Sequence, residues 1–259
     1  ISFLVMAVSM GLTASLVLLV KEPPRPKGAT IKNDDPLMVR SRKLFVEPFV
    51  QIWGRYGRVM IPILGLVFVY RLSDFTMGVM ASPLYADIGY TPAIVGAVQS
   101  GPGVAATFVG LFIGGLASQQ IGLTRSLIVG SILTLVTNGA YAWFASTAGS
   151  DDVGLLTMAV CADNLAGGFV TTVFIAYLSS LVDPANAATQ YALFSSLYAF
   201  VNKFLAGYSG VLADTLGYVN FFLLTASYAI PAALLVMVVG WMMRRYPPQP
   251  VGFSEGTKT

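Results

Sequence analysis

Two oppositely charged residues lie one helical turn apart inside an apolar stretch of this chain. The stretch runs from residue 61 to residue 80, and the charged residues are Arg71 and Asp74. An ion in the hydrocarbon of a membrane is strongly destabilised unless it is paired or faces a water-filled cavity. Two further ionisable residues, Asp163 and Lys203, occur in later apolar stretches. Charges contributed by several membrane helices are typical of a transporter that moves ions or charged solutes.

The spacing of Arg71 and Asp74 allows two interpretations. Residues three apart share one face of a helix, so the two side chains can neutralise each other in a structural ion pair. Alternatively, Asp74 exchanges a proton, and its protonation releases Arg71 to bind an anionic substrate. A guanidinium can bind a carboxylate through two parallel hydrogen bonds, which suits this second role.

Asp163 and Lys203 also allow a structural and a functional interpretation. A carboxylate in a medium of low dielectric constant takes up a proton more readily than in water unless it is paired, and proton-coupled carriers use this property. Lys203 follows Asn202 and lies about one turn after Tyr198, where it could bind a substrate carboxylate as a point charge. The alternative is that Lys203 pairs with Asp163 across the helical bundle.

The composition places the chain in a lipid bilayer. Of its 259 residues, 56% are hydrophobic and 10% are charged, and its mean hydropathy is +0.74; soluble domains carry roughly 25% charged residues. The chain contains no His and a single Cys, Cys161, which excludes His-ligated cofactors, a His-based triad and an intrachain disulfide. With no nucleotide-binding motif either, we expect no enzymatic activity, cofactor, metal site or nucleic-acid partner.

Seven stretches of the chain are long and apolar enough to cross a membrane as helices of about 20 residues. They predict an all-α polytopic membrane protein with about seven transmembrane helices. The stretches are residues 1–20, 59–84, 92–117, 123–146, 153–181, 190–213 and 218–243.

These stretches divide the chain into four parts. Residues 1–20 are expected to form one transmembrane helix, and residues 59–246 a six-helix bundle. Residues 21–58 form a basic linker whose second half mixes aromatic and basic residues. That half suits either a helix lying in the headgroup layer or the ordinary start of the next membrane helix. Residues 247–259 form a polar tail.

The positive charges indicate an orientation in the membrane. Nine of the fifteen Lys and Arg residues lie between Lys21 and Arg58. With seven spans, every basic residue outside the spans falls on one face, and the connections on the other face carry only acids. The positive-inside rule then places the linker and the C-terminus in the cytoplasm. The N-terminus falls outside, so we expect the chain to be part of a longer protein with earlier spans.

One span, a long basic linker and six further spans resemble the later part of a twelve-helix major facilitator. Residues 115–125, Gly-Leu-Ala-Ser-Gln-Gln-Ile-Gly-Leu-Thr-Arg, resemble the loop signature of that superfamily, although Ser118 stands where the signature usually has Asp. The resemblance implies a gating loop that includes Gly115, Gly122 and Arg125. An ordinary glycine-containing turn between helices is the alternative.

Four further runs resemble the AmpG muropeptide permeases. They are residues 70–74, 163–168, 174–178 and 188–196, the last reading Ala-Thr-Gln-Tyr-Ala-Leu-Phe-Ser-Ser. Asp163 replaces a more familiar Glu, and Lys203 replaces a more common Arg, so both charge signs are kept. The resemblance implies proton-driven import of N-acetylglucosamine–anhydro-N-acetylmuramic acid, with or without peptide, across a bacterial inner membrane.

This implied function assigns roles to the polar residues of the spans. Asp74 and Asp163 are the candidates for proton coupling. The candidates for substrate binding are Arg71, Lys203, Asn164, Asn202, Gln99, Tyr70, Tyr177 and Tyr198, the tyrosines by stacking on sugar rings. The expected partners are membrane lipid, the anionic sugar-peptide, protons, and either the missing N-terminal helices or another membrane subunit. The alternative function is a non-transporting accessory subunit of a larger membrane complex, derived from half of a facilitator.

Overall fold

The computed structural model describes residues 8, 10–13, 15, 47–183 and 187–247 of the chain. The chain divides into two units, Ile1–Asp35 and Pro36–Thr259. In the first unit the described residues are helical. Most of the span expected at residues 1–20 lies outside the described residues, as do residues 21–46 and 248–259.

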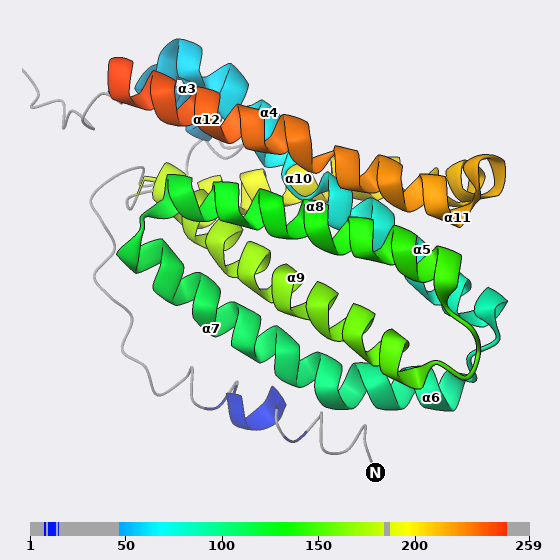
Figure 1. Cartoon of the computed structure of the whole chain (residues 1–259). Coiled ribbons are helices and arrows are strands. Elements are labelled where there is room, and N and C mark those ends of the chain that lie inside the picture. The colour runs from blue at the N-terminus through cyan, green and yellow to red at the C-terminus, as the bar shows by residue number, and fades with distance from the viewer. Residues whose placement is uncertain (1–7, 9, 14, 16–46, 184–186, 248–259) are drawn as a thin grey trace, which may run out of the picture. The chain divides into compact units, whose positions relative to one another are not determined.

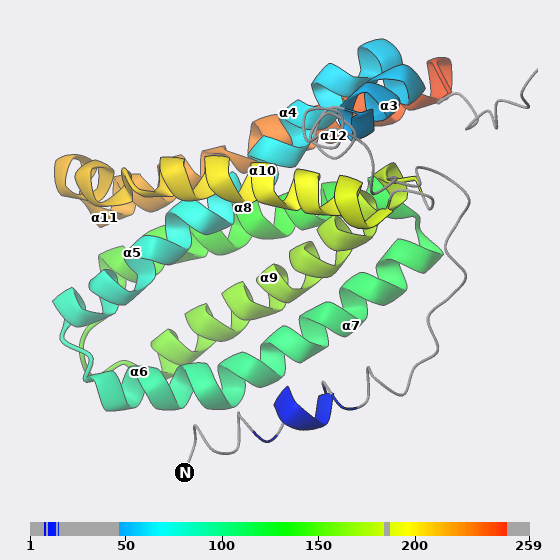
Figure 2. The ribbon, with the colours of Figure 1, turned by 180° about the vertical axis from the view of Figure 1, so that it is seen from behind.

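Every regular element described in the second unit is a helix (Figures 1 and 2). A short 3₁₀ turn, η2, covers Gly57–Val59, and a π-helical segment, η3, covers Gln99–Gly103. The α-helices are α3 Glu47–Tyr56, α4 Met60–Val69, α5 Leu72–Ile88, α6 Pro92–Val98, α7 Val104–Gln120, α8 Leu123–Thr147, α9 Val153–Leu181, α10 Ala187–Ala206, α11 Ser209–Ser227 and α12 Ala229–Arg245.

Five helical stretches of the described chain are long and apolar enough to cross a membrane: Ile52–Ile88, Pro92–Gln120, Leu123–Thr147, Val153–Leu181 and Ser209–Arg245. The expected span at residues 190–213 overlaps the 20-residue α10, Ala187–Ala206, which is not among the five although it has only one charged residue. Its polar residues, including Gln190 and Asn202, lower its hydropathy. Within α11, Gly217 has a φ of 74°, which breaks the last stretch where the sequence predicts a connection.

The helices pack around α8 and α9 (Figure 1). Helix α9 lies between α7 and α8, while α8 also contacts α11 and α12, and α5 contacts α10 and α11. Small residues allow the closest of these approaches. A Cβ atom on Gly110 would collide with the carbonyl oxygen of Leu165, and one on Gly168 would collide with that of Thr107. Gly110, Gly114 and Gly168 therefore allow the backbones of α7 and α9 to pack closely.

The glycines after α10 and at the start of α11 lie in different surroundings. A Cβ atom on Gly210 would meet no atom of another residue within 4 Å. A Cβ atom on Gly207 would approach only its own preceding turn, at Phe204 and Lys203. In the described chain these two glycines therefore do not mediate close contact between helices.

A buried polar network joins three of the helices. Asn138 of α8 donates to the Ser73 hydroxyl of α5 over 2.7 Å, and Ser73 donates to the carbonyl oxygen of Thr225 in α11 over 2.6 Å. The Ser209 hydroxyl donates in turn to the carbonyl oxygen of Thr76 over 3.1 Å. Such hydrogen bonds fix the register of apolar helices that could otherwise slide past one another.

One end of the bundle gathers acidic residues. The Tyr90 hydroxyl donates to the carbonyl oxygen of Asp152 over 3.0 Å, and the Tyr218 hydroxyl donates to Asp87 over 2.6 Å. These contacts bring together the α5–α6 connection, the α8–α9 connection and the kink at Gly217. Burial, and then the charges of Asp152 and Asp151, raise the pKa of Tyr90 above its ordinary value. Its hydroxyl therefore stays a hydrogen-bond donor at neutral pH.

The opposite end of the bundle gathers arginines. The Tyr56 hydroxyl donates to the carbonyl oxygen of Leu181 over 3.1 Å, which joins the end of α3 to the end of α9. Thr124, at the start of α8, lies against Gly240 near the end of α12. The basic residues described at this end are Arg55, Arg58, Arg125, Arg244 and Arg245.

Candidate functional site

The membrane stretch that carries Arg71 and Asp74 is interrupted at the charged pair. Helix α4 ends at Val69 and α5 begins at Leu72. Arg71 caps α5 with φ −98° and ψ −3°, and Asp74 lies in the first turn of that helix. The partial positive charge of a helix N-terminus stabilises a carboxylate at this position. Interrupted membrane helices commonly line substrate sites, because their free backbone groups must face protein or a cavity.

Arg71 and Asp74 form an ion pair, with 3.1 Å between Nη1 and Oδ2. Their side chains are 18% and 22% exposed, so the pair is largely withdrawn from solvent. Nη1 of Arg71 also donates to the Thr171 hydroxyl of α9 over 2.9 Å, and the guanidinium lies 5.8 Å from the centre of the Phe75 ring. Thr134 of α8 lies near the Asp74 carboxylate. The pair therefore sits where α5, α8 and α9 meet.

Asp163 of α9 faces the same region of the bundle. Its carboxylate interacts electrostatically with both Arg71 and Asp74. It also interacts electrostatically with two buried tyrosines, Tyr85 and Tyr141. The hydroxyls of these tyrosines are hydrogen bonded to each other over 2.5 Å. Two carboxylates and one guanidinium thus share this part of the structure. With both acids ionised the group carries one net negative charge, and the uptake of one proton makes it neutral.

Lys203 lies apart from this group, on an exposed face of α10. Among the described residues it forms no ion pair, so the alternative in which it pairs with Asp163 is not observed. Its neighbour Asn202 is buried and donates through Nδ2 to the carbonyl oxygens of Phe68, over 3.1 Å, and Tyr198, over 2.8 Å. Asn202 therefore ties α10 to α4, and Lys203 faces away from that contact.

Asn164 of α9 lies against the π-helical segment η3, and Gln99 is the first residue of that segment. A Cβ atom on Gly103 would lie 2.6 Å from Nδ2 of Asn164, so the amide packs directly against that glycine. Gln99 opens η3 and is exposed. Pro102, which lies between Gly101 and Gly103, removes a backbone hydrogen bond within η3. This segment brings polar groups close to the residue that follows Asp163.

The tyrosines predicted to stack on sugars differ in their surroundings. Tyr70 is buried, donates to the carbonyl oxygen of Leu127 over 3.0 Å and stacks on Phe174 at 5.4 Å between ring centres. Tyr177 is also buried, and its hydroxyl has no hydrogen-bond partner among the described residues. Tyr198 is partly exposed and meets Phe174 edge-on at 5.2 Å. Of the three, Tyr198 is the one with an accessible ring surface.

The predicted gating loop forms a tight turn between α7 and α8. Gly122 has a φ of 83°, which L-amino acids other than glycine rarely adopt. Gly115 lies within the last turns of α7, and Arg125 is exposed in the first turn of α8. The Ser118 hydroxyl donates to the carbonyl oxygen of Gly114 over 2.8 Å. Ser118 therefore bonds within its own helix and carries no charge to hold a partner.

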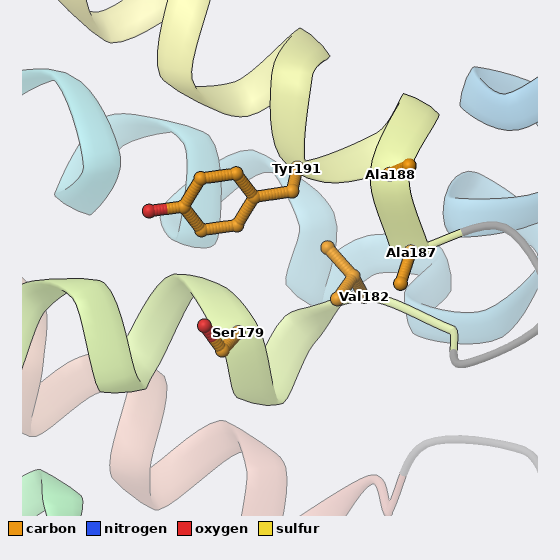
Figure 3. A pocket seen from close by; sticks show the side chains of 5 residues that line it. All are labelled: Ser179, Val182, Ala187, Ala188 and Tyr191. Carbon is orange, nitrogen blue, oxygen red and sulfur yellow. The ribbon is translucent and has the colours of Figure 1, made fainter. Parts of the chain in front are cut away.

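A pocket of about 430 Å³ opens between the end of α9 and the start of α10 (Figure 3). It is lined by Ser179, Val182, Ala187, Ala188 and Tyr191, and none of the charged residues borders it. The Tyr191 ring extends across the space between the two helices in Figure 3. The pocket is mostly apolar, so the electrostatic site remains the group formed by Arg71, Asp74 and Asp163.

Several residues around this group were not predicted from the sequence. Thr171 and Thr134 look like ordinary members of apolar helices, since a threonine hydroxyl can bond to a carbonyl oxygen of its own helix. Tyr85 and Tyr141 carry no charge that would distinguish them from other aromatic residues of the spans. Thr171 follows Asp163 by eight residues, a spacing that places both residues on roughly one face of a helix. This spacing is the only sequence signal that links them. Among the described residues, no group of three or more His, Cys, Asp or Glu side chains is arranged to hold a metal ion.

A family model and several curated proteins match the sequence of this chain. A model of the Major Facilitator Superfamily matches the chain over residues 1–202 and, in an overlapping match, over residues 63–258. The chain is 32% identical over 192 residues to "Putative transporter AmpG 4" of Rickettsia conorii, covering 74% of this chain and 45% of that protein. It is 33% identical over 196 residues to the "Anhydromuropeptide permease" of Escherichia coli K12, covering 74% and 39%.

A third relative covers more of the chain at lower identity. "Putative transporter AmpG 1" of Rickettsia bellii is 28% identical over 210 residues, covering 81% of this chain and 49% of that protein. The chain thus spans about half the length of the curated relatives it matches.

Proposed function

This chain belongs to the major facilitator superfamily, and we propose that it forms the C-terminal part of a proton-coupled carrier that imports muropeptides. The chain is a multi-pass membrane protein of a transporter family and not an enzyme. The proposed substrate is N-acetylglucosamine–anhydro-N-acetylmuramic acid, with or without peptide. The proposed location is the inner membrane of a bacterium. The name of the Escherichia coli relative supports the choice of substrate.

The observation that carries this proposal is the arrangement of Arg71, Asp74 and Asp163. Arg71 is held by Asp74 at 3.1 Å and by the Thr171 hydroxyl at 2.9 Å. Protonation of Asp74 removes the ion pair and leaves the guanidinium free to bind a carboxylate of the substrate. Release of the substrate restores the pair and expels the proton. One proton then travels with one anionic group, which couples the two movements.

Lys203 and Tyr198 provide a second contact region for the same substrate. Lys203 is exposed and unpaired among the described residues, and its ammonium can bind a second carboxylate or a peptide carbonyl. Tyr198 lies about one turn earlier on α10 and offers part of its ring for stacking on a sugar. A substrate with a sugar part and an anionic peptide part fits residues of these two kinds.

The distribution of charge supports an orientation of the carrier. The end that holds Arg55, Arg58, Arg125, Arg244 and Arg245 is proposed to face the cytoplasm, and the acidic end the periplasm.

Uptake by vesicles that contain the full-length carrier tests the proposal. Labelled anhydromuropeptide should accumulate in energised vesicles, and both an uncoupler and Asp74→Asn should reduce accumulation at least about tenfold, as expected when a proton-transferring group is lost. The matched control is Asp87→Asn, because Asp87 lies at the acidic end and bonds to Tyr218. Uptake that is indifferent to the uncoupler and to Asp74→Asn would contradict the coupling. A full-length carrier that takes up no muropeptide would contradict the substrate.

A further inference from the structure

Helix α3 has two apolar faces, of which the bundle covers one. Ile52 and Tyr56, four residues apart, are buried in the core of the bundle. Val50 and Trp53 are 61% and 52% exposed on other sides of the helix. Trp53 lies within the apolar stretch Ile52–Ile88 and Val50 lies just before it, so we expect their exposed side chains to meet lipid. Tryptophan with neighbouring arginines is typical of the headgroup layer of a bilayer.

Arg55, on the same helix, has buried hydrogen-bond donors without an acceptor. Nε and Nη1 of its guanidinium are shielded from solvent and hydrogen bond to no described residue. The guanidinium lies over the Tyr56 ring at 5.4 Å from its centre, and Tyr56 is itself fixed by its hydrogen bond to the carbonyl oxygen of Leu181. The position of Arg55 is thus fixed while two of its guanidinium nitrogens have no acceptor among the described residues. Adjacent N–H groups of a guanidinium can donate two parallel hydrogen bonds to two oxygens of a phosphate.

The end of α12 adds further charge beside α3. Both views show the last turns of α12 next to α3 (Figures 1 and 2), and Val239 of α12 packs in the same core cluster as Ile52 and Tyr56. Arg244 and Arg245 are exposed in the last turn of α12, and Arg245 lies 5.8 Å from the centre of the 60% exposed Trp241 ring. Arg58 is exposed in η2, between α3 and α4.

We propose that α3, η2 and the last turn of α12 form a binding site for the phosphate of an anionic phospholipid. Arg55 binds the phosphate oxygens, and Arg58, Arg244 and Arg245 supply the surrounding positive charge. Trp53 and Trp241 lie along the glycerol and upper acyl region. Basic clusters at the ends of membrane helices bind such headgroups, and each basic residue adds to the affinity. Trp53 and Trp241 favour a lipid over free phosphate, because free phosphate has no apolar part to pack against their rings. This inference does not depend on transport.

Native mass spectrometry of the full-length carrier, delipidated in mild detergent, tests the site. Phosphatidylglycerol should bind more tightly than phosphatidylcholine, and Arg55→Gln should weaken phosphatidylglycerol binding roughly fivefold, as expected for one lost basic contact. Arg125→Gln is the matched control, because Arg125 is an exposed arginine at the same end but on α8. Glycerol phosphate, added as a soluble competitor, should displace little of the bound lipid.

A second variant distinguishes a loss of lipid binding from a loss of folding. Arg244→Gln combined with Arg245→Gln changes only exposed side chains and should also weaken phosphatidylglycerol binding, while Arg125→Gln should not. Three results would overturn the proposal: equal binding of the two lipids, equal losses in Arg55→Gln and Arg125→Gln, or full displacement by glycerol phosphate. The last result would identify a site for free phosphate instead.

Discussion

At the scale of single residues, the Arg71 guanidinium connects two helices through two different partners. It pairs with Asp74 on its own helix and donates to the Thr171 hydroxyl on α9. The Thr171 contact is neutral and does not depend on a proton, whereas the Asp74 contact does. Protonation of Asp74 therefore changes how strongly Arg71 is held without releasing it from α9. In the proposed mechanism, Arg71 can therefore bind and release a substrate carboxylate while Thr171 keeps the guanidinium in position.

A double-mutant cycle on Arg71 and Asp74 measures how strongly they are coupled. Each single variant, Arg71→Gln or Asp74→Asn, should destabilise the full-length carrier, because it leaves a largely buried charge without its partner. The double variant should be more stable than the sum of the single effects predicts, by about 1–3 kcal/mol. Thermal unfolding in detergent measures all four proteins. Additive effects would show that the two residues do not interact in the folded carrier.

The charged residues of the site could be predicted from the sequence, but their neighbours could not. A charge in an apolar stretch stands out, so Arg71, Asp74, Asp163 and Lys203 could be selected from the sequence, although the structure brings only the first three together. Tyr70 is different: it was predicted as a stacking residue, yet it is buried in the core with its hydroxyl bonded to Leu127. A membrane helix is apolar on every side, and its sequence therefore gives little sign of which aromatic residues face inward.

At the scale of helices, contact between α7 and α9 depends on residues without side chains. Gly110, Gly114 and Gly168 lie where the two backbones approach most closely, and a Cβ atom on Gly114 would lie 2.8 Å from the carbonyl oxygen of Phe169. In lipid, helices associate through close packing and hydrogen bonds rather than through the hydrophobic effect. The Thr172 hydroxyl, which donates to the carbonyl oxygen of Leu111 over 3.3 Å, adds one such bond.

Two adjacent glycines of α9 provide a matched test of this contact. Gly168→Ala should destabilise the carrier by about 1–3 kcal/mol, because the new methyl group would collide with the backbone of α7. Gly167→Ala should change the stability little, because a Cβ atom there meets no atom within 4 Å. The difference in melting temperature between the two variants is the measurement. Equal melting temperatures would mean that α7 and α9 are not in close contact.

The sequence predicts where helices start and end better than where they break. The stretch predicted at residues 153–181 coincides with α9, and α8 extends the stretch at 123–146 by a single residue. The irregular segment η3 has a signal in the sequence, because Pro102 lies between two glycines. The break between α4 and α5 was not predicted, because Tyr70 and Arg71 carry no proline or glycine signal. It follows from tertiary contacts of these two side chains, which a sequence pattern does not contain.

At the scale of the whole molecule, the described bundle is electrically polarised along its helices. One end carries Asp87, Asp151, Asp152 and Asp214 without a described basic residue, and the other carries five arginines. By the positive-inside rule, such polarity supports the proposed orientation, with the arginine-rich end in the cytoplasm.

Cysteine labelling in intact cells tests the orientation. In a full-length carrier with Cys161→Ser, a cysteine introduced by Ser150→Cys at the acidic end should react with an impermeant maleimide. One introduced by Arg125→Cys at the arginine-rich end should react only after the membrane is permeabilised. Both positions are exposed, so access to the protein surface does not distinguish them. The reverse pattern would show that the orientation is inverted.

The central claim is that muropeptide and proton move together through a carrier in which Arg71, Asp74 and Asp163 form the coupling group. The most direct test is the internal pH of proteoliposomes that contain the full-length carrier and a trapped pH-sensitive dye. Without an imposed gradient, external anhydromuropeptide should acidify the interior, and Asp74→Asn should abolish this change while Asp87→Asn retains it. Entry of muropeptide without any change of internal pH would contradict proton coupling.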